Sequence, residues 1–480
     1  MKRKVSIKDV VCSLFLSGYS IFLCLLSPLN VFSNEQSATD STVFRYVALE
    51  MAKGNIPYKD TFDHKGPLIY FLNYLGLKID DRLGIWIIEL LCLVCTCYFL
   101  YKTANMFCGK MCSVIAVVAT TSLFGVYFQG GNLTEEYALP FISISVYFLT
   151  KYLVENKIKK WDVFWCGISM AAVLMLRPNM IAVWIGFVAV ILIKEIANKQ
   201  WKRIQIEIGY FSAGLIIGMI PFFIYLISAG AMKDFFDAYL LFNLKYQKGA
   251  DISRIIRAFK YYFLQPIVFL SLFSLVFAYI KAIKEKIKSD AWIIYCNFLS
   301  MFFTYVFLCM PGSRTPHYGM VLIPVLIMPI AMVLSKISRN NPTSLGRLFV
   351  ATILLSMALY SNGEKIFKNI KIDTNSKYEY QTVVDIISVY TDEDDVISVF
   401  GNKNSIYLTS NRLSASKYSY QFPLVYYNSD IYLEYKSDIQ EKMPKIIVIS
   451  EENETFMSDF LSYIDSLGYY EIEDKIYAIR

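Results

Sequence analysis

Repeated long apolar runs are the feature that most limits how this 480-residue chain can fold. Hydrophobic residues make up 56% of the sequence, more than a soluble domain of this length can bury. Runs of about 18 or more apolar residues recur, and each can cross a bilayer as a helix. We therefore predict an α-helical polytopic membrane protein with about eleven spans. The spans are expected near residues 10–32, 84–101, 112–128, 137–153, 163–176, 180–193, 207–229, 262–280, 291–310, 318–335 and 348–361.

The charges between these runs predict the orientation of the chain. The loops assigned to the cytoplasm hold 21 Lys/Arg against 7 Asp/Glu, whereas the tail from 362 to 480 holds 12 against 20. Basic residues gather in cytoplasmic loops, so we expect a multi-pass protein of the cell (plasma or inner) membrane with a cytoplasmic N-terminus. The net charge of +7 then reflects topology and not binding to nucleic acid. The loops counted as cytoplasmic are 1–9, 102–111, 150–162, 194–207, 281–290 and 336–347.

Two domains are expected from this division. The first is a transmembrane domain over 1–361, and the second is a small soluble α/β domain over 362–480 on the extracytoplasmic side. Alternation and apolar runs in the tail predict both helices and buried strands. The predicted elements are a helix over 378–390, strands at 396–400 and 446–449, a helix over 456–467 and a last strand over 470–479.

The segment 33–83, between the first two spans, is expected to be a structured external catalytic loop with interfacial helices. Asp40 can cap a helix over 41–53, a position that aspartate favours. Val43 and Val47 share one face of that helix, which is predicted to lie on the bilayer. The same Asp40 carboxylate, at the mouth of a membrane cleft, is also a candidate general base, and the two interpretations are compatible.

A compact polar cluster follows in the same loop: Asp63, His64, Lys65, Gly66 and Pro67. Proline at a first helical position predicts a helix that starts there. Free N–H groups at a helix start favour an anion, and the ammonium of Lys65 adds a full charge. The cluster is either a polar turn before an interfacial helix or a phosphate site to which His64 donates a hydrogen bond.

Three further segments carry charges that are predicted to be external. Glu135 and Glu136 stand at a helix start, where acidic residues complement the helix dipole or take part in catalysis. Arg177, Arg314 and His317 lie next to membrane helices. The cationic side chains there either reach the lipid headgroups or bind and stabilise the phosphate of the donor.

The order of these motifs resembles the C-type membrane glycosyltransferases that use polyprenyl-phosphate sugars. The nearest group is the bacterial branch of the protein O-mannosyltransferases and aminoarabinose transferases. The resemblance covers residues 1 to about 360 by layout. The motifs that carry it are Asp40, Asp-His-Lys-Gly-Pro at 63–67, Asn-Leu-Thr-Glu-Glu at 132–136, Leu-Arg-Pro-Asn at 176–179 and Arg-Thr-Pro-His-Tyr at 314–318.

This resemblance implies roles for several residues. Asp40 matches the acidic catalytic residue of the first external loop, and Glu135 or Glu136 matches the second acidic residue, with Glu135 favoured. Lys65-Gly66-Pro67 stands where aminoarabinose-type members often have Lys-Pro-Pro, so the substrate of that subgroup does not transfer directly. No cofactor is certain, but Asp40 and Glu135 could hold a divalent metal.

We thus expect an inverting glycosyltransferase that moves a sugar from a polyprenyl-phosphate donor to a hydroxyl on the extracytoplasmic side. The acceptor would be a cell-surface glycan, a lipid-linked glycan or a protein, and membrane lipids are the other partners. A membrane glycan polymerase that uses a diphosphate-linked donor is one alternative. A lipid-linked sugar transporter or flippase is another; it predicts charges inside spans and pseudo-symmetric halves, whereas most charges here sit at span ends.

Overall fold

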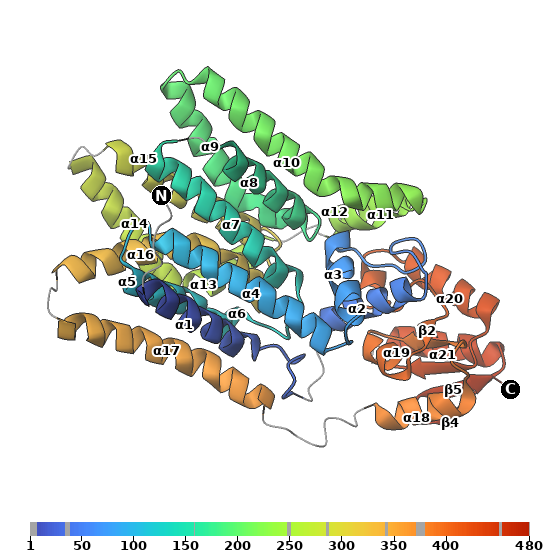
Figure 1. Ribbon diagram of the computed structural model, residues 1–480. Helices are drawn as coiled ribbons and strands as arrows, with labels where there is room; N and C mark the ends of the chain where they lie inside the picture. The colour runs from blue at the N-terminus through green and yellow to red at the C-terminus, as the bar shows by residue number, and fades with distance from the viewer. Residues whose placement is uncertain are drawn as a thin grey trace. The chain divides into compact units, whose positions relative to one another are not determined.

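The computed structural model describes residues 7–33, 39–157, 159–246, 251–284, 288–340, 344–370, 380–450 and 454–479. Most of these residues are helical, and a small sheet is formed by the C-terminal part of the chain (Figure 1). The contacts divide the chain into two compact units, each built from several segments. Unit 1 consists of Met1–Asn30, Trp86–Phe222 and Gly249–Ile370, and unit 2 of Val31–Ile85, Phe223–Lys248 and Lys371–Arg480.

Unit 1 is a bundle of long helices with a few short ones between them. They are α1 (Ile7–Cys24), most of α4 (Leu83–Ala104), α5 (Lys110–Thr121), α6 (Phe124–Tyr127), α7 (Thr134–Glu155), α8 (Lys160–Leu174), η1 (Pro178–Ile181), α9 (Ala182–Ala197), most of α10 (Trp201–Ser228), α13 (Ile252–Phe263), α14 (Pro266–Lys284), α15 (Lys288–Cys309), η3 (Pro316–Leu322), α16 (Ile323–Asn340) and α17 (Ser344–Ile370).

Seven helices of the described residues are long and apolar enough to cross a membrane. The helices α13 and α14 add an eighth candidate if this pair, bent by 86°, is one span. The chain is therefore a multi-pass, mostly helical membrane protein. The spans predicted at 10–32, 163–176 and 348–361 stay predictions, and several side chains of the last one lie outside the described residues. The seven helices are Leu83–Ala104, Lys110–Tyr127, Thr134–Glu155, Pro178–Ala197, Trp201–Ser228, Ala291–Cys309 and Pro316–Lys336.

Small residues let the helices of this bundle approach closely. A Cβ atom on Gly186 of α9 would lie 2.3 Å from the backbone nitrogen of Ser300 in α15, so only glycine fits there. Such close backbone approach is typical of membrane helices, where no hydrophobic effect drives one helix onto another. The α9–α15 contact thus holds the segment after Arg177 against the helix that leads to His317.

Unit 2 contains the first loop, a short middle segment and the tail. The loop forms α2 (Thr39–Ala52) and α3 (Pro67–Leu77). One predicted detail is wrong: Asp40 lies in the first turn of α2 and not before it. The middle segment forms α11 (Met232–Phe235), η2 (Phe236–Phe242) and α12 (Asn243–Tyr246).

The tail forms a mixed five-stranded sheet in the order β2-β1-β3-β5-β4. The strands β1 (Val396–Phe400) and β3 (Ile446–Ile449) pair in parallel and have the predicted bounds. The single last strand predicted over 470–479 is wrong, because β4 (Tyr469–Glu473) and β5 (Ile476–Ile479) form an antiparallel hairpin there. The other tail elements are α18 (Gln381–Tyr390), α19 (Asn404–Ser410), β2 (Leu413–Ser414), η5 (Leu424–Tyr426), α20 (Asp430–Lys442) and α21 (Glu454–Ser466). Residues 378 and 379, where the first predicted tail helix begins, lie outside the described residues.

The first loop and the tail share one hydrophobic core. Tyr46 of α2 is fully buried in the cluster formed by strand residues such as Val399 and Val448. Its hydroxyl oxygen accepts a hydrogen bond from the backbone N–H of Ser414 at 2.8 Å. Val43 and Val47 are also buried within the protein, which corrects the prediction that their face lies on the bilayer. The tail sheet therefore forms the support on which the first loop is built.

Candidate active site

The 63–67 motif leads into α3 as the sequence predicts. Gly66 has an extended backbone and precedes the helix, and Pro67 is its first residue. Gly66 has no side chain to cap the first N–H groups of α3, and none of the described side chains bonds to them, so they can bind an anion. The motif therefore places Lys65 directly before the positive end of a helix dipole.

Asp63 organises this motif from a buried position, with only 2% of its surface exposed. The hydroxyl of Tyr70 donates to Oδ2 at 2.7 Å, and the hydroxyl of Tyr420, from the tail, donates to Oδ1 at 2.8 Å. His64 Nδ1 lies 3.3 Å from Oδ1. Burial opposes ionisation, but the hydrogen bonds of His64 and Tyr70 and the charge of Lys65 outweigh it and hold the pKa of Asp63 below its usual range.

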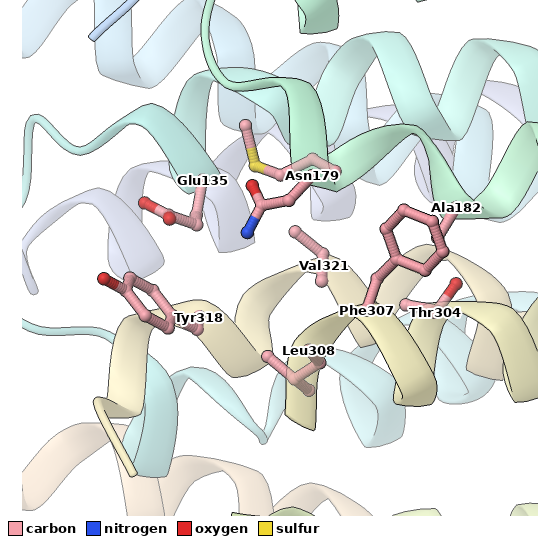
Figure 2. Close-up of a pocket in the computed structure, with 9 residues that line it drawn as sticks. Glu135, Asn179, Ala182, Thr304, Phe307, Leu308, Tyr318 and Val321 are labelled. Carbon is pink, nitrogen blue, oxygen red and sulfur yellow. The ribbon is translucent and has the colours of Figure 1, made fainter. Parts of the chain in front are cut away.

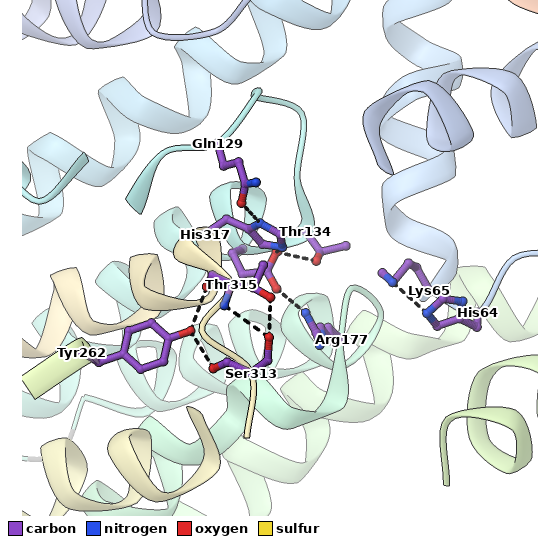
Figure 3. Close-up of polar contacts among 10 residues, drawn as sticks. His64, Lys65, Gln129, Thr134, Arg177, Tyr262, Ser313, Thr315 and His317 are labelled. Atoms are coloured by element: carbon purple, nitrogen blue, oxygen red, sulfur yellow. Dashed lines mark hydrogen bonds and ion pairs between the residues drawn. The ribbon is translucent and has the colours of Figure 1, made fainter. Parts of the chain in front are cut away.

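His64 connects Asp63 to Lys65, as Figure 3 shows for the Lys65–His64 contact. Lys65 Nζ lies 2.9 Å from His64 Nε2. An ammonium group can only donate, so Nε2 accepts and the ring proton sits on Nδ1, toward Asp63. Burial and the charge of Lys65 lower the pKa of His64, against the opposing effects of Asp63 and Asp40. The imidazole is therefore neutral and holds the lysine in place.

The middle segment of unit 2 completes the support of this cluster. The side-chain amide of Asn243 donates to the backbone carbonyl of His64 at 2.7 Å. The ring of Phe242 packs 5.5 Å from the imidazole ring, centroid to centroid. Tyr58 donates its hydroxyl to the carbonyl of Lys65 at 2.8 Å. Segments from three parts of the chain thus set the direction of the Lys65 ammonium group.

Asp40 differs from the other acidic candidates because it is exposed. Among the residues that the structure describes, no donor forms a hydrogen bond or ion pair with its carboxylate. It lies near enough to His64 to affect that ring electrostatically, so the two residues face one region of unit 2. A solvent-facing carboxylate without a partner is free to take a proton.

Glu135, in unit 1, is buried and already neutralised. Arg177 Nη1 donates to its Oε1 at 2.5 Å, and Thr134 Oγ1 donates to Oε2 at 2.9 Å. The guanidinium also stacks on the ring of Tyr318, 4.1 Å from its centroid. His317 Nε2 lies 4.0 Å from Oε2, while its Nδ1 bonds to Gln129 Oε1 at 3.0 Å (Figure 3). The sequence motifs at 134–136, 177 and 314–318 therefore do meet in space.

A pocket of about 330 Å³ lies next to Glu135 in unit 1. Figure 2 shows Glu135, Asn179 and Tyr318 at one end and apolar side chains such as Phe307 and Leu308 at the other. Asn179 Oδ1 is buried without a hydrogen bond to the described residues. Arg314, by contrast, is exposed and makes no ion pair with the described residues.

A second buried carboxylate in unit 1, Glu89, escaped the sequence analysis. It lies inside α4 and is fully buried; its Oε2 accepts from Ser27 Oγ at 2.7 Å and its Oε1 from the backbone N–H of Asn132 at 2.5 Å. Gly131, with φ of +63°, passes so near that a Cβ would lie 2.8 Å from Oε1. Glu136, 1% exposed, interacts with Glu89. Glu89 thus fixes the position of the turn that leads into α7. The sequence signal for this residue was a single acidic residue within an apolar run.

The carboxylates of the site are also candidate metal ligands. Among the described residues, no group of three or more His, Cys, Asp or Glu side chains lies close enough together to hold a metal ion. At Glu135 both oxygens accept hydrogen bonds, and the adjacent guanidinium would repel a second cation. Glu135 therefore does not fit a divalent metal.

Comparison with solved structures shows which fold this arrangement belongs to. The chain is similar to the apo form of ArnT from Cupriavidus metallidurans, with a TM-score of 0.64, 12% identity, and coverage of 98% of this chain and 97% of that one. The same enzyme bound to undecaprenyl phosphate matches with a TM-score of 0.59, 12% identity and coverage of 99% and 98%. These values establish a common fold and confirm, at that level, the resemblance to C-type membrane glycosyltransferases.

A more distant likeness extends to archaea. AglB, an oligosaccharyltransferase from Archaeoglobus fulgidus in complex with an inhibitory peptide and a dolichol-phosphate, matches with a TM-score of 0.51 and 11% identity. That alignment covers 98% of this chain and 74% of AglB. A search of curated protein sequences finds no significant match.

A family model also matches the sequence directly. It is described as "Putative competence-induced protein Ccs4 N-terminal domain" and matches residues 1–347. The match includes the first loop with Asp40 and Lys65, and all of the Glu135 cluster. Since it covers more than two thirds of the sequence, the chain belongs to the Ccs4 N-terminal domain family.

Proposed function

We propose that this protein is an inverting glycosyltransferase that moves a sugar from a polyprenyl-phosphate donor to a hydroxyl group on the extracytoplasmic side of the membrane. The acceptor is a cell-surface glycan, a lipid-linked glycan or a protein. The observation that carries the proposal is the Lys65 ammonium, bonded to a neutral imidazole at the start of α3.

A lysine in this setting is suited to bind a phosphate. A carboxylate partner would cancel the charge of Lys65. The neutral ring of His64 instead accepts a hydrogen bond from one of the three N–H groups of the Lys65 ammonium and leaves its charge intact. The uncapped N–H groups of α3 add further donors beside it. A charge-assisted hydrogen bond to a phosphate oxygen is worth about 1.5–3 kcal/mol, so this group can stabilise a departing lipid phosphate.

Asp40 is assigned as the base. Its carboxylate takes the proton of the acceptor hydroxyl as that oxygen attacks the anomeric carbon. The bond from this carbon to the phosphate oxygen breaks, and the electron pair leaves with the polyprenyl phosphate, next to Lys65. The phosphate leaves without a general acid, and a single displacement inverts the anomeric centre. Glu135 is assigned as the counter-charge of Arg177, because its proton-accepting oxygens are already engaged.

The comparisons support a lipid phosphate as the group that is recognised. ArnT of this fold is bound to undecaprenyl phosphate, and AglB of this fold is in complex with a dolichol-phosphate. Both are polyprenyl-type lipids with one phosphate.

The test is a transfer assay in membranes with a panel of purified polyprenyl-phosphate sugars. Asp40→Asn should abolish transfer, whereas Asp430→Asn should not, because Asp430 is an exposed acid in the first turn of another helix of unit 2. Lys65→Ala should weaken donor use about ten- to hundredfold, the equivalent of one charge-assisted hydrogen bond. The exposed Lys59→Ala is its control. Near-native turnover by Asp40→Asn would remove Asp40 from the base role.

A diphosphate-linked donor, as a glycan polymerase would use, forms the second arm of the same assay. One lysine and one helix start fit a monophosphate better than a diphosphate, so we expect the monophosphate donors to be preferred.

The orientation is tested with single cysteines in a cysteine-free background. Cysteine at Ile79 and at Val389, both exposed, should react with an impermeant reagent in intact cells, and cysteine at Trp201 should react only after the membrane is opened.

A further inference from the structure

A second cavity of unit 1 lies at the other end of α7 from Glu135. It has a volume of about 810 Å³ and is bounded by α7, α8, α9 and α10; we call it the α7–α10 groove. Glu135 is the second residue of α7, whereas Tyr152, in the groove, is near its end. At a rise of about 1.5 Å per residue, the two sites are roughly 25 Å apart. The groove therefore does not belong to the candidate active site.

Most of the groove wall is apolar. The side chains that form it include Leu149, Val163, Ile191, Ile208 and Phe211. Ile208 is 54% exposed on the outer face of a helix that can span the membrane, so the groove is open toward lipid. A hydrocarbon chain is the natural occupant of such a wall.

One acidic side chain in the groove lacks a hydrogen-bond donor among the described residues, although the charges of Lys194 and Arg203 act on it. Glu207 of α10 is 9% exposed, and neither of its carboxylate oxygens accepts a hydrogen bond from the described residues. Tyr152 is adjacent but donates its single O–H to Glu195 at 2.6 Å. Lys194 and Arg203 bond to Glu195 as well, at 3.3 and 3.4 Å. A buried carboxylate without a donor is costly, so Glu207 is poised for a ligand that brings one.

The polar end of the groove is set up for a headgroup. Two of its lysines are paired, Lys151 with Asp162 at 2.8 Å and Lys159 with Glu155 at 3.2 Å. Lys157 is exposed and makes no ion pair with the described part of the chain. It offers a charge for a phosphate.

Two exposed tryptophans mark the same end of the bundle. Trp161 is the second residue of α8 and is 67% exposed, and Trp201 is the first residue of α10 and is 59% exposed. Tryptophan of this kind gathers where the hydrocarbon meets the headgroups. This places the mouth of the groove at headgroup level.

We propose that the α7–α10 groove binds a phosphodiester lipid whose headgroup carries a primary ammonium. Its acyl chain lies along the apolar wall, its ammonium donates to Glu207, and its phosphate faces Lys157. A quaternary ammonium cannot donate a hydrogen bond, and a glycerol headgroup donates only from neutral hydroxyls, without a positive charge to pair with the carboxylate. Phosphatidylethanolamine and lysyl-phosphatidylglycerol both have the required chemistry. The proposal does not depend on the proposed function.

The test is lipid retention by the purified full-length protein, measured by native mass spectrometry after equilibration with phosphatidylethanolamine, lysyl-phosphatidylglycerol, phosphatidylcholine or phosphatidylglycerol. At least one of the two primary-ammonium lipids should be retained about tenfold better than phosphatidylcholine, as expected for one charge-assisted hydrogen bond. The two arms show which lipid is the ligand. Equal retention of all four lipids would overturn the proposal.

Variants locate the binding. Glu207→Gln should remove the preference, while Glu364→Gln, an exposed carboxylate elsewhere in unit 1, should keep it. Should Glu207→Gln fail to fold, Ser212→Phe, which fills the groove without changing its charge, should lower retention of every lipid. If either groove variant retained as much lipid as the native protein, with the same preference for the primary-ammonium lipids, the lipid would bind elsewhere. That result would refute the proposal.

Discussion

Asp63 in unit 2 and Glu135 in unit 1 are both buried carboxylates, but they are satisfied by different groups. Asp63 accepts hydrogen bonds from two tyrosine hydroxyls and lies beside a neutral imidazole, whereas Glu135 is paired with the guanidinium of Arg177. The first arrangement leaves a cation, Lys65, free to meet a ligand. The second neutralises its cation internally. Two buried acids that each lie near a basic residue in the fold therefore differ in what they can offer to a substrate.

The largest expected effect concerns the ion pair. Arg177→Met leaves Glu135 buried without a counter-charge, which should lower the free energy of unfolding by about 3–5 kcal/mol. Adding Glu135→Leu should restore most of this loss. The measurement is unfolding of the purified protein by denaturant. The exposed Arg314→Met is the control and should change stability by less than about 0.5 kcal/mol. A double variant no more stable than Arg177→Met would show that the pair is not the source of the effect.

Glu89 extends the comparison to a buried carboxylate that, like Asp63, is held by neutral donors. Glu89→Leu leaves the Ser27 hydroxyl and the Asn132 N–H without their acceptor. Each buried group left unpaired should lower the free energy of unfolding by about 1–3 kcal/mol. Glu89→Gln retains an acceptor oxygen and should recover much of that stability. The same unfolding experiment measures both variants. Equal losses in the two would mean that the side-chain charge, and not the hydrogen bonds, matters at this position.

Tyr420→Phe tests the neutral donors of Asp63. It removes one hydrogen bond to a charged acceptor, which should lower the free energy of unfolding by about 1.5–3 kcal/mol. Lys65-dependent donor binding should weaken with it, because Asp63 orients His64. Tyr390→Phe, at an exposed tail position, is the matched control. Unchanged stability in Tyr420→Phe would mean that the hydrogen bond from the tail does not stabilise Asp63.

The smallest effect is the pH dependence that arises from His64. Its pKa is lowered by burial and by Lys65, so below about pH 6.5 the unfolded chain binds a proton that the folded chain does not. The stabilisation is therefore fully present above that pH and is lost as the pH falls toward the lowered pKa. Thermal melts across pH should show this slope in the native protein and a smaller one in His64→Gln. Identical slopes would mean that His64 is not held neutral.

Local patterns predicted much of this structure. The helix start at Pro67 and the bounds of β1 and β3 follow from one proline and two short apolar runs, signals that are contained within a few residues. The pairing of Tyr46 with Ser414, or of His317 with Gln129, has no local signature, because the partners are 368 and 188 residues apart. The apolar face of α2 was assigned to the bilayer because a helix face that is buried in protein and one that faces lipid have the same pattern of apolar residues. The sequence predicted which acidic and basic residues belong to the site. It did not predict which of them are paired with each other.

The position of Tyr46 in the core of the tail has a consequence for biosynthesis. Val399 and Val448 complete that core, yet they are made about 350 to 400 residues after Tyr46, which at roughly 5–20 residues per second is a delay of roughly 20–80 s. During this time α2 has no sheet to pack against, and its buried face is exposed to water, lipid or chaperones. A chain interrupted before the tail would carry the whole first loop, with Asp40 and Lys65, and still lack the core that shapes it. Completion of the last strands is therefore the event that commits the candidate active site to its form.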